Sequence, residues 1–95
     1  MIKITTIQGY WSDDANGWVS ETLKLTGDAW IEVELPSKGR LVIKKSDKIE
    51  GPYPKALITK WEGPRFKIRL YGSTEKRYIK IITTETPKRI ELVNI

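Results

Sequence analysis

Hydrophobic and polar residues alternate along most of this 95-residue chain, and no long stretch shows the helical spacing of apolar residues. The segment 30–35 shows the pattern most simply, because Ile31 and Val33 share one face of an extended strand and Glu32 and Glu34 share the other. Such alternation is typical of a strand that covers a core with one face and meets water with the other. The pattern therefore predicts an all-β protein.

Turn signals built from Gly, Pro, Asn and Asp recur about every 8 to 12 residues, which is the rhythm of a sandwich or barrel. The expected strands cover residues 2–7, 18–25, 30–35, 40–45, 55–61, 65–71, 77–84 and 89–94. Residues 72–76 are expected to close a hairpin between the strands 65–71 and 77–84.

These strands predict one compact antiparallel β-sandwich of about eight strands, Ig-like or jelly-roll-like, that forms a single domain over residues 1–95. A small barrel is the second choice. A barrel of the oligonucleotide-binding kind would carry a helix between its third and fourth strands, and the Gly- and Pro-containing segment 46–54 is a poor helix former.

The composition excludes several kinds of chemistry. The chain has no Cys and no His, so it has no disulfide, no thiolate zinc site and no Ser-His or Cys-His nucleophile pair. We expect no enzymatic activity, no metal and no cofactor. No apolar run approaches the roughly 20 residues that span a bilayer, and the first residues do not read as a signal peptide, so membrane insertion is not expected.

Charge is unevenly distributed along the chain, whose formal net charge is +5. Residues 1–36 carry two basic and six acidic residues, whereas residues 37–95 carry fifteen basic and six acidic ones. Three interpretations are open: binding to nucleic acid or another anionic surface, head-to-tail assembly of copies, or pairing of acidic and basic strands within one sheet.

The stretch 8–18, Gln-Gly-Tyr-Trp-Ser-Asp-Asp-Ala-Asn-Gly-Trp, is predicted to be the tip of a hairpin or β-arch. The pair Asn16-Gly17 suits a type I′ turn, in which both central residues have positive φ. Asp13 and Asp14 are expected to hold the approach through local backbone hydrogen bonds. A calcium loop of the EF-hand type is not expected, because its twelfth position would be Leu23 where a bidentate Glu is needed.

The same stretch also has the composition of a sugar-binding face, in which aromatic rings stack on the sugar and polar groups bind its hydroxyls. The alternative is that Trp11 or Trp18 fills one end of the core. The candidate glycan-binding residues are Tyr10, Trp11, Asp13, Asp14, Asn16 and Trp18.

A second candidate site combines basic and aromatic residues. Alternation places Lys67, Arg69 and Tyr71 on the outward face of one strand, and Tyr78 and Lys80 outward on the next if Ile79 and Ile81 face inward. A hairpin would bring the two strands together into a patch on which phosphates meet cations and bases stack on Tyr. Single-stranded nucleic-acid binding is therefore a further hypothesis; the alternative is a solvated strand face.

The leading hypothesis is a non-enzymatic structural or assembly module whose partner is a protein or another copy of the chain. Decoration or tail proteins of a virion and accessory domains at cell surfaces work in this way. In this interpretation acidic side chains of one protomer face basic side chains of the next. The acidic set is Asp13, Asp14, Glu32 and Glu34, and the basic set is Lys44, Lys45, Lys67, Arg69 and Lys80.

Overall fold

The computed structural model describes residues 2–25, 27–36, 39–61, 65–70 and 78–94, which form ten strands and no helix. The strands are β1 (Lys3–Thr6), β2 (Gly9–Ser12), β3 (Gly17–Ser20), β4 (Leu23–Lys24), β5 (Ala29–Glu34), β6 (Gly39–Ser46), β7 (Lys55–Trp61), β8 (Arg65–Leu70), β9 (Tyr78–Thr83) and β10 (Arg89–Asn94). No membrane-spanning helix is found in the described part of the chain.

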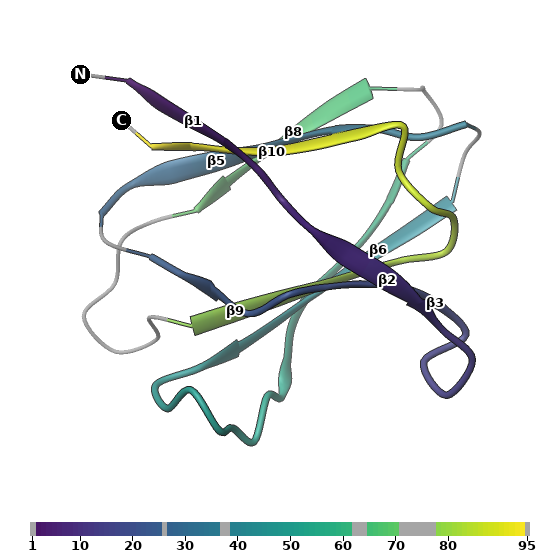
Figure 1. Ribbon diagram of the computed structural model, residues 1–95, viewed down its shortest axis with the longest axis horizontal. Coiled ribbons are helices and arrows are strands. Elements are labelled where there is room, and N and C mark those ends of the chain that lie inside the picture. Colours follow the sequence, from purple (N-terminus) through teal and green to yellow (C-terminus); the bar gives the residue numbers. More distant parts are fainter. Residues whose placement is uncertain (1, 26, 37–38, 62–64, 71–77, 95) are drawn as a thin grey trace.

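The strands form two antiparallel sheets that pack face to face, so the predicted β-sandwich is confirmed (Figure 1). Sheet A has the strand order β1-β10-β5-β8. Sheet B has the order β2-β3-β9-β6-β7, and the short strand β4 also pairs with β9.

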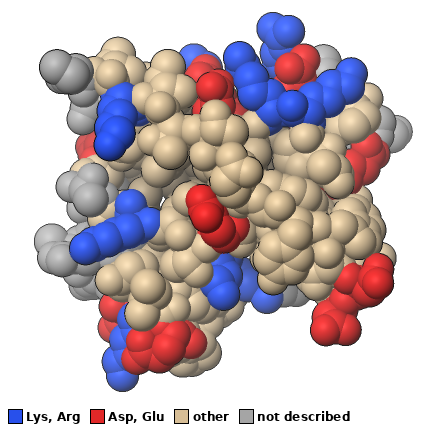
Figure 2. All heavy atoms as spheres, viewed as in Figure 1, with Lys and Arg blue, Asp and Glu red and all other residues tan. Residues whose placement is uncertain are grey.

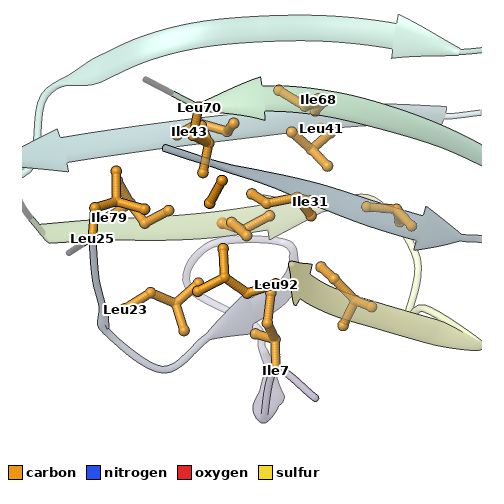
Figure 3. Close-up of a cluster of buried hydrophobic side chains, with 14 of the residues drawn as sticks. Ile7, Leu23, Leu25, Ile31, Leu41, Ile43, Ile68, Leu70, Ile79 and Leu92 are labelled. Carbon is orange, nitrogen blue, oxygen red and sulfur yellow. The ribbon is translucent and has the colours of Figure 1, made fainter. Parts of the chain in front are cut away.

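The core lies between the sheets and follows the alternation of the sequence. In β5, Ile31 and Val33 are buried while Glu32 and Glu34 are only partly covered. Figure 3 shows side chains from both sheets meeting in one apolar layer. Members of this layer that are less than 2% exposed are Ala29, Ile31, Leu35, Leu41, Ile43, Ile79 and Ile81. Burial of this apolar area is the main source of the domain's stability.

The predicted strand 18–25 is interrupted, so Val19 and Leu23 do not share a face as they would in one continuous strand. The chain advances four residues from Val19 to Leu23 while β9 advances only three, from Ile82 to Ile79, so one residue is extra. Such a bulge reverses the alternation. On the N-terminal side of the bulge, Trp18 and Ser20 therefore face the core and Val19 faces outward. On its C-terminal side, Leu23 faces the core.

The side chain of Ser20 provides a hydrogen-bond acceptor where the bulge interrupts the backbone pairing of β9. Its buried hydroxyl accepts a hydrogen bond from the Ile81 amide at 2.8 Å and donates one to the Glu21 carbonyl at 2.9 Å. A buried amide without a partner costs about 1–3 kcal/mol, so this side chain replaces the missing backbone acceptor.

Residues 2–12 close one side of the sandwich by crossing from one sheet to the other. β1 pairs with β10 in sheet A, and β2, which was not predicted as a strand, pairs with β3 in sheet B. Figure 1 shows this purple segment running from sheet A at the top of the view to sheet B below it. At the crossing the buried Ile7 donates its amide to the Ile90 carbonyl at 3.0 Å, and the Gln8 carbonyl accepts from the Glu21 amide at 2.8 Å.

The predicted hairpin between residues 65–71 and 77–84 is wrong. β8 is the edge strand of sheet A beside β5, whereas β9 is central in sheet B between β6 and the strands β3 and β4. The connection is thus a crossover between sheets, and its residues 71–77 lie outside the described residues.

Glycine at position 9 is required by the packing of Trp18, and a substitution tests this. A Cβ at Gly9 would overlap the indole ring of Trp18. We expect Gly9→Ala to lower the free energy of unfolding by about 1–3 kcal/mol, since overpacking displaces the ring. Gly27→Ala is the matched control, because a Cβ there meets nothing within 4 Å, and its effect should stay within about 0.5 kcal/mol. Urea denaturation measures both; equal unfolding midpoints would contradict this packing.

Candidate binding surface

The β2–β3 hairpin confirms the predicted turn but not its type. A four-residue loop, 13–16, connects the strands, and the Asn16 amide donates to the Asp13 carbonyl at 3.1 Å. Within this hairpin only Asn16 has a positive φ, of 53°, so the expected type I′ pair with Gly17 is wrong. The local side-chain bond comes from Ser12, whose hydroxyl oxygen accepts from the Ala15 amide at 3.2 Å.

The three aromatic residues of this hairpin do not form one surface. Trp18 is only 6% exposed and belongs to the core, which contradicts its predicted role in glycan binding. Trp11 is 48% exposed, and its indole N–H donates to the Asp13 carboxylate at 3.1 Å. Tyr10 is 63% exposed and, as the neighbour of Trp11 in an extended strand, points to the other face.

Tyr10 begins a row of apolar side chains on the outer face of sheet B. The register pairs Tyr10 with Val19, Val19 with Ile82, and Ile82 with Val42. Directly opposed residues lie on the same face of an antiparallel sheet. Because residues on either side of Ile82 and of Val42 are buried in the core, this row faces outward.

Cationic side chains border this row. Arg40 and Lys44 are two residues from Val42 on β6, and Lys80 is two residues from Ile82 on β9. Lys80 extends over the ring of Tyr53, with its Nζ atom 4.6 Å from the ring centroid, and the Tyr53 hydroxyl donates to the Ile49 carbonyl at 2.7 Å. The sheet B face is hereafter the surface made by Tyr10, Val19, Arg40, Val42, Lys44, Tyr53, Lys80 and Ile82.

The sheet B face has two open hollows, and Ala15 at the hairpin tip lines both of them. The β6 hollow, of about 330 Å³, is lined by Ala15, Asn16, Arg40, Val42, Lys44 and Ile82, together with Thr83 and Thr84. The hairpin hollow, of about 420 Å³, has Tyr10, Asp14, Lys44, Tyr53, Lys80 and Ile82 among its lining residues. The described lining of the β6 hollow contains no carboxylate, whereas Asp14 contributes one to the hairpin hollow.

The outer face of sheet A is different, because its charges are paired with one another. The ion pairs are Arg65–Glu34 at 3.3 Å, Lys67–Glu32 at 3.4 Å, Arg69–Asp28 at 3.5 Å and Arg89–Glu91 at 3.4 Å. Figure 2 shows acidic and basic atoms intermingled at the upper right of the view, where sheet A lies in Figure 1. Pairing of acidic and basic strands within one sheet, one of the three interpretations of the charge asymmetry, therefore describes this face.

The predicted nucleic-acid patch is divided between the two sheets. Lys67 and Arg69 lie on sheet A, where each has an acidic partner. Tyr78 and Lys80 lie on β9 of sheet B and alternate with the buried Ile79 and Ile81 as expected. The prediction of one continuous patch is wrong because β8 and β9 are not neighbours. Tyr71 lies outside the described residues.

The cations of the sheet B face have no acidic partner among the described side chains: no ion pair there involves Arg40, Lys44 or Lys80. Lys44 and Lys80 are also direct register partners, and both are partly buried. Like charges placed opposite each other destabilise a sheet. The chain thus holds two cations side by side at a cost to its own stability.

The structure therefore brings parts of the two predicted sites together. Tyr10 and Asp14 from the proposed glycan face line the hairpin hollow together with Lys80 from the proposed nucleic-acid patch. Asn16 lines the β6 hollow, and Asp13 lies on the same hairpin tip. Arg40, Val42, Tyr53 and Ile82 were not predicted. Alternation around the buried Leu41 and Ile43 does place Arg40 and Val42 outward, but only the pairing of β6 with β9 reveals their neighbours.

No group of three or more potential metal ligands is found among the described residues. Comparison with protein-family models, with curated proteins and with solved structures finds no match to this chain. The class established here is thus structural, an antiparallel β-sandwich, and the candidate function depends on the sheet B face.

The two Trp residues of the hairpin are expected to differ in their effect on stability. Trp18→Ala should lower the free energy of unfolding by about 3–5 kcal/mol because it empties the core, and Trp11→Ala should change it by about 0.5 kcal/mol or less. Thermal unfolding followed by circular dichroism measures both. Equal losses would contradict the assignment of Trp18 to the core and Trp11 to the surface.

Neutralising a lysine should have opposite effects on the two faces. Lys44→Gln removes repulsion with Lys80 and should raise the free energy of unfolding by about 0.2–1 kcal/mol. Lys67→Gln removes an ion pair with Glu32 and a contact with the Trp30 ring, so it should lower that free energy by a similar amount. Urea denaturation at low salt measures both changes, and both should shrink in about 1 M salt. The same sign for both variants would contradict the charge difference between the faces.

Proposed function

We propose that this chain is a non-enzymatic module that docks a protein partner through the sheet B face. The observation that supports it most directly is the Lys44–Lys80 register pair, two cations without an ion-pair partner among the described residues, beside a partly exposed apolar row. Selection for stability alone would replace one of them, and sheet A demonstrates that this chain can pair its charges internally.

The aliphatic composition of the row favours a protein over the other partners. Single-stranded nucleic acid and sugars both need aromatic platforms, and here Tyr10 is at the end of the row while Val19, Val42 and Ile82 form its centre. An apolar centre with a charged rim is the usual anatomy of a protein–protein interface. The open hollows suit a side chain that projects from a partner.

A role in assembly requires only such a docking face, as in a protein that decorates a virion or a cell surface. Of the four acidic residues predicted to take part in docking, only Asp13 and Asp14 remain candidates. Glu34 already pairs with Arg65, and Glu32 pairs with Lys67. Whether the partner is a different protein or a second copy, the proposal assigns it the same face.

The test is a selection of peptides from a random display library against the immobilised protein. Peptides that bind should shift the backbone amide signals of Val42 and Ile82 in a nuclear magnetic resonance titration. Val42→Thr and Ile82→Thr should weaken their binding at least tenfold, because each removes apolar contact area at the centre of the row. Both variants keep a β-branched side chain, so the domain should remain folded.

Ile4→Thr is the matched control, since Ile4 is an exposed aliphatic residue of sheet A, and it should bind the peptides as the wild type does. Glycan arrays and a thymidine oligonucleotide are tested in parallel. Retention of a glycan or of the oligonucleotide, with no peptide bound at the sheet B face, would contradict the proposal.

A further inference from the structure

The β6 hollow differs in charge from an otherwise similar hollow on sheet A. The sheet A hollow, of about 350 Å³, is lined by Glu32, Val33, Arg65, Lys67 and Arg89. Each of its three cations has a carboxylate partner at 3.3–3.4 Å, supplied by Glu34, Glu32 or Glu91. The β6 hollow has two cations, Arg40 and Lys44, and no carboxylate in its described lining. Among the described lining residues, the β6 hollow therefore carries no negative charge, whereas its counterpart carries that of Glu32.

Neutral groups in the β6 hollow can also receive an anion. Asn16 brings an amide from the hairpin tip, and Thr84 brings a hydroxyl from the end of β9. The Thr84 hydroxyl oxygen accepts from the Arg40 amide at 3.2 Å, which leaves its own proton free to be donated to a ligand. A guanidinium group binds a carboxylate with two parallel hydrogen bonds, and an ammonium group adds a second positive charge.

The floor of the hollow sets the spacing of a ligand. Arg40, Val42 and Lys44 occupy alternate positions of β6, so their side chains project from one face in the order cation, apolar, cation. Four residues of a strand span about 13 Å. An extended segment of a partner that lies along β6 presents its own alternate side chains with the same period. It matches this face if it carries an acidic residue, an apolar residue two positions later and an acidic residue two positions after that.

From these observations we infer that the partner docks an extended segment of this pattern, with its carboxylates at Arg40 and Lys44 and its apolar side chain on Val42 and Ile82. The inference rests on the proposed function and deepens it by naming the chemistry of the partner. Carboxylates also relieve the repulsion between Lys44 and Lys80, because a third charge of opposite sign lies near both. Docking thus recovers stability that the free chain lacks.

The test uses synthetic peptides of about ten residues, labelled with fluorescein, in which a central Leu is flanked two positions away on each side by Glu, Gln or Lys. Fluorescence anisotropy measures their binding to the full chain. The Glu peptide should bind at least tenfold more tightly than the Gln peptide, and the Lys peptide should be weaker still. The advantage of the Glu peptide should shrink between about 50 mM and 300 mM salt, as the screening length falls.

Substitutions locate the interaction. Arg40→Gln and Lys44→Gln should each reduce the affinity for the Glu peptide several-fold and leave the affinity for the Gln peptide unchanged. Lys3→Gln is the control for net charge, because Lys3 is an exposed cation on β1 of sheet A, and it should leave both affinities unchanged. A peptide with Glu residues adjacent to the Leu tests the spacing and should bind less tightly.

The outcomes separate this inference from the proposed function. If the Glu and Gln peptides bind equally well and Val42→Thr weakens both, the face docks protein but the acidic pattern is wrong. If no peptide shifts the amide signals of the sheet B face, both proposals fail. If a thymidine oligonucleotide binds through Arg40 and Lys44 and the peptides do not, the anionic partner is a nucleic acid and the inference is overturned.

Discussion

The alignment of β9 with its neighbours is the constraint on which both the core and the candidate surface depend. β9 is hydrogen-bonded to β6 on one side and to β3 and β4 on the other. Successive side chains of a strand point to opposite faces, so a shift of one residue would exchange the two sets. The register that buries Ile79 and Ile81 therefore also places Lys80 beside Lys44 and Ile82 beside Val42.

The outer faces of the two sheets differ in whether charges of opposite or of like sign are register partners. On sheet A, register partners such as Glu32 and Lys67 have opposite sign, and each pair contributes modestly to stability. On sheet B, Lys44 and Lys80 are partners of the same sign. Arg65, Lys67, Arg69 and Arg89 on sheet A are thus paired with carboxylates, whereas Arg40, Lys44 and Lys80 on sheet B have no ion-pair partner among the described residues. Under the proposed docking, these unpaired cations would attract an acidic partner to the sheet B face at low salt.

Local pattern was sufficient to predict strands but not their neighbours. Alternation predicted strands at residues 30–35, 40–45, 55–61 and 65–71, and the structure has β5, β6, β7 and β8 at these places. It did not reveal the bulge after Val19, because a reversal of alternation looks like a polar interruption at Glu21. It also placed β8 beside β9, since a short polar connection favours a hairpin over a crossover. That single error of topology accounts for the division of the nucleic-acid patch, and the same missing information hid the sheet B face.

The hydrogen bond of Ser20 restricts which residues evolution can accept at this position. Ser20 lies among aliphatic side chains in the interior, where an alkyl residue of equal size would normally be accepted. Its oxygen is nevertheless the acceptor that holds the Ile81 amide at the point where β3 ends and β4 has not begun. Homologous chains that share this bulge should retain a hydroxyl at this position while the aliphatic residues around it drift. A small polar residue inside an otherwise variable apolar layer can therefore be used to align the sequences of distant relatives of this domain.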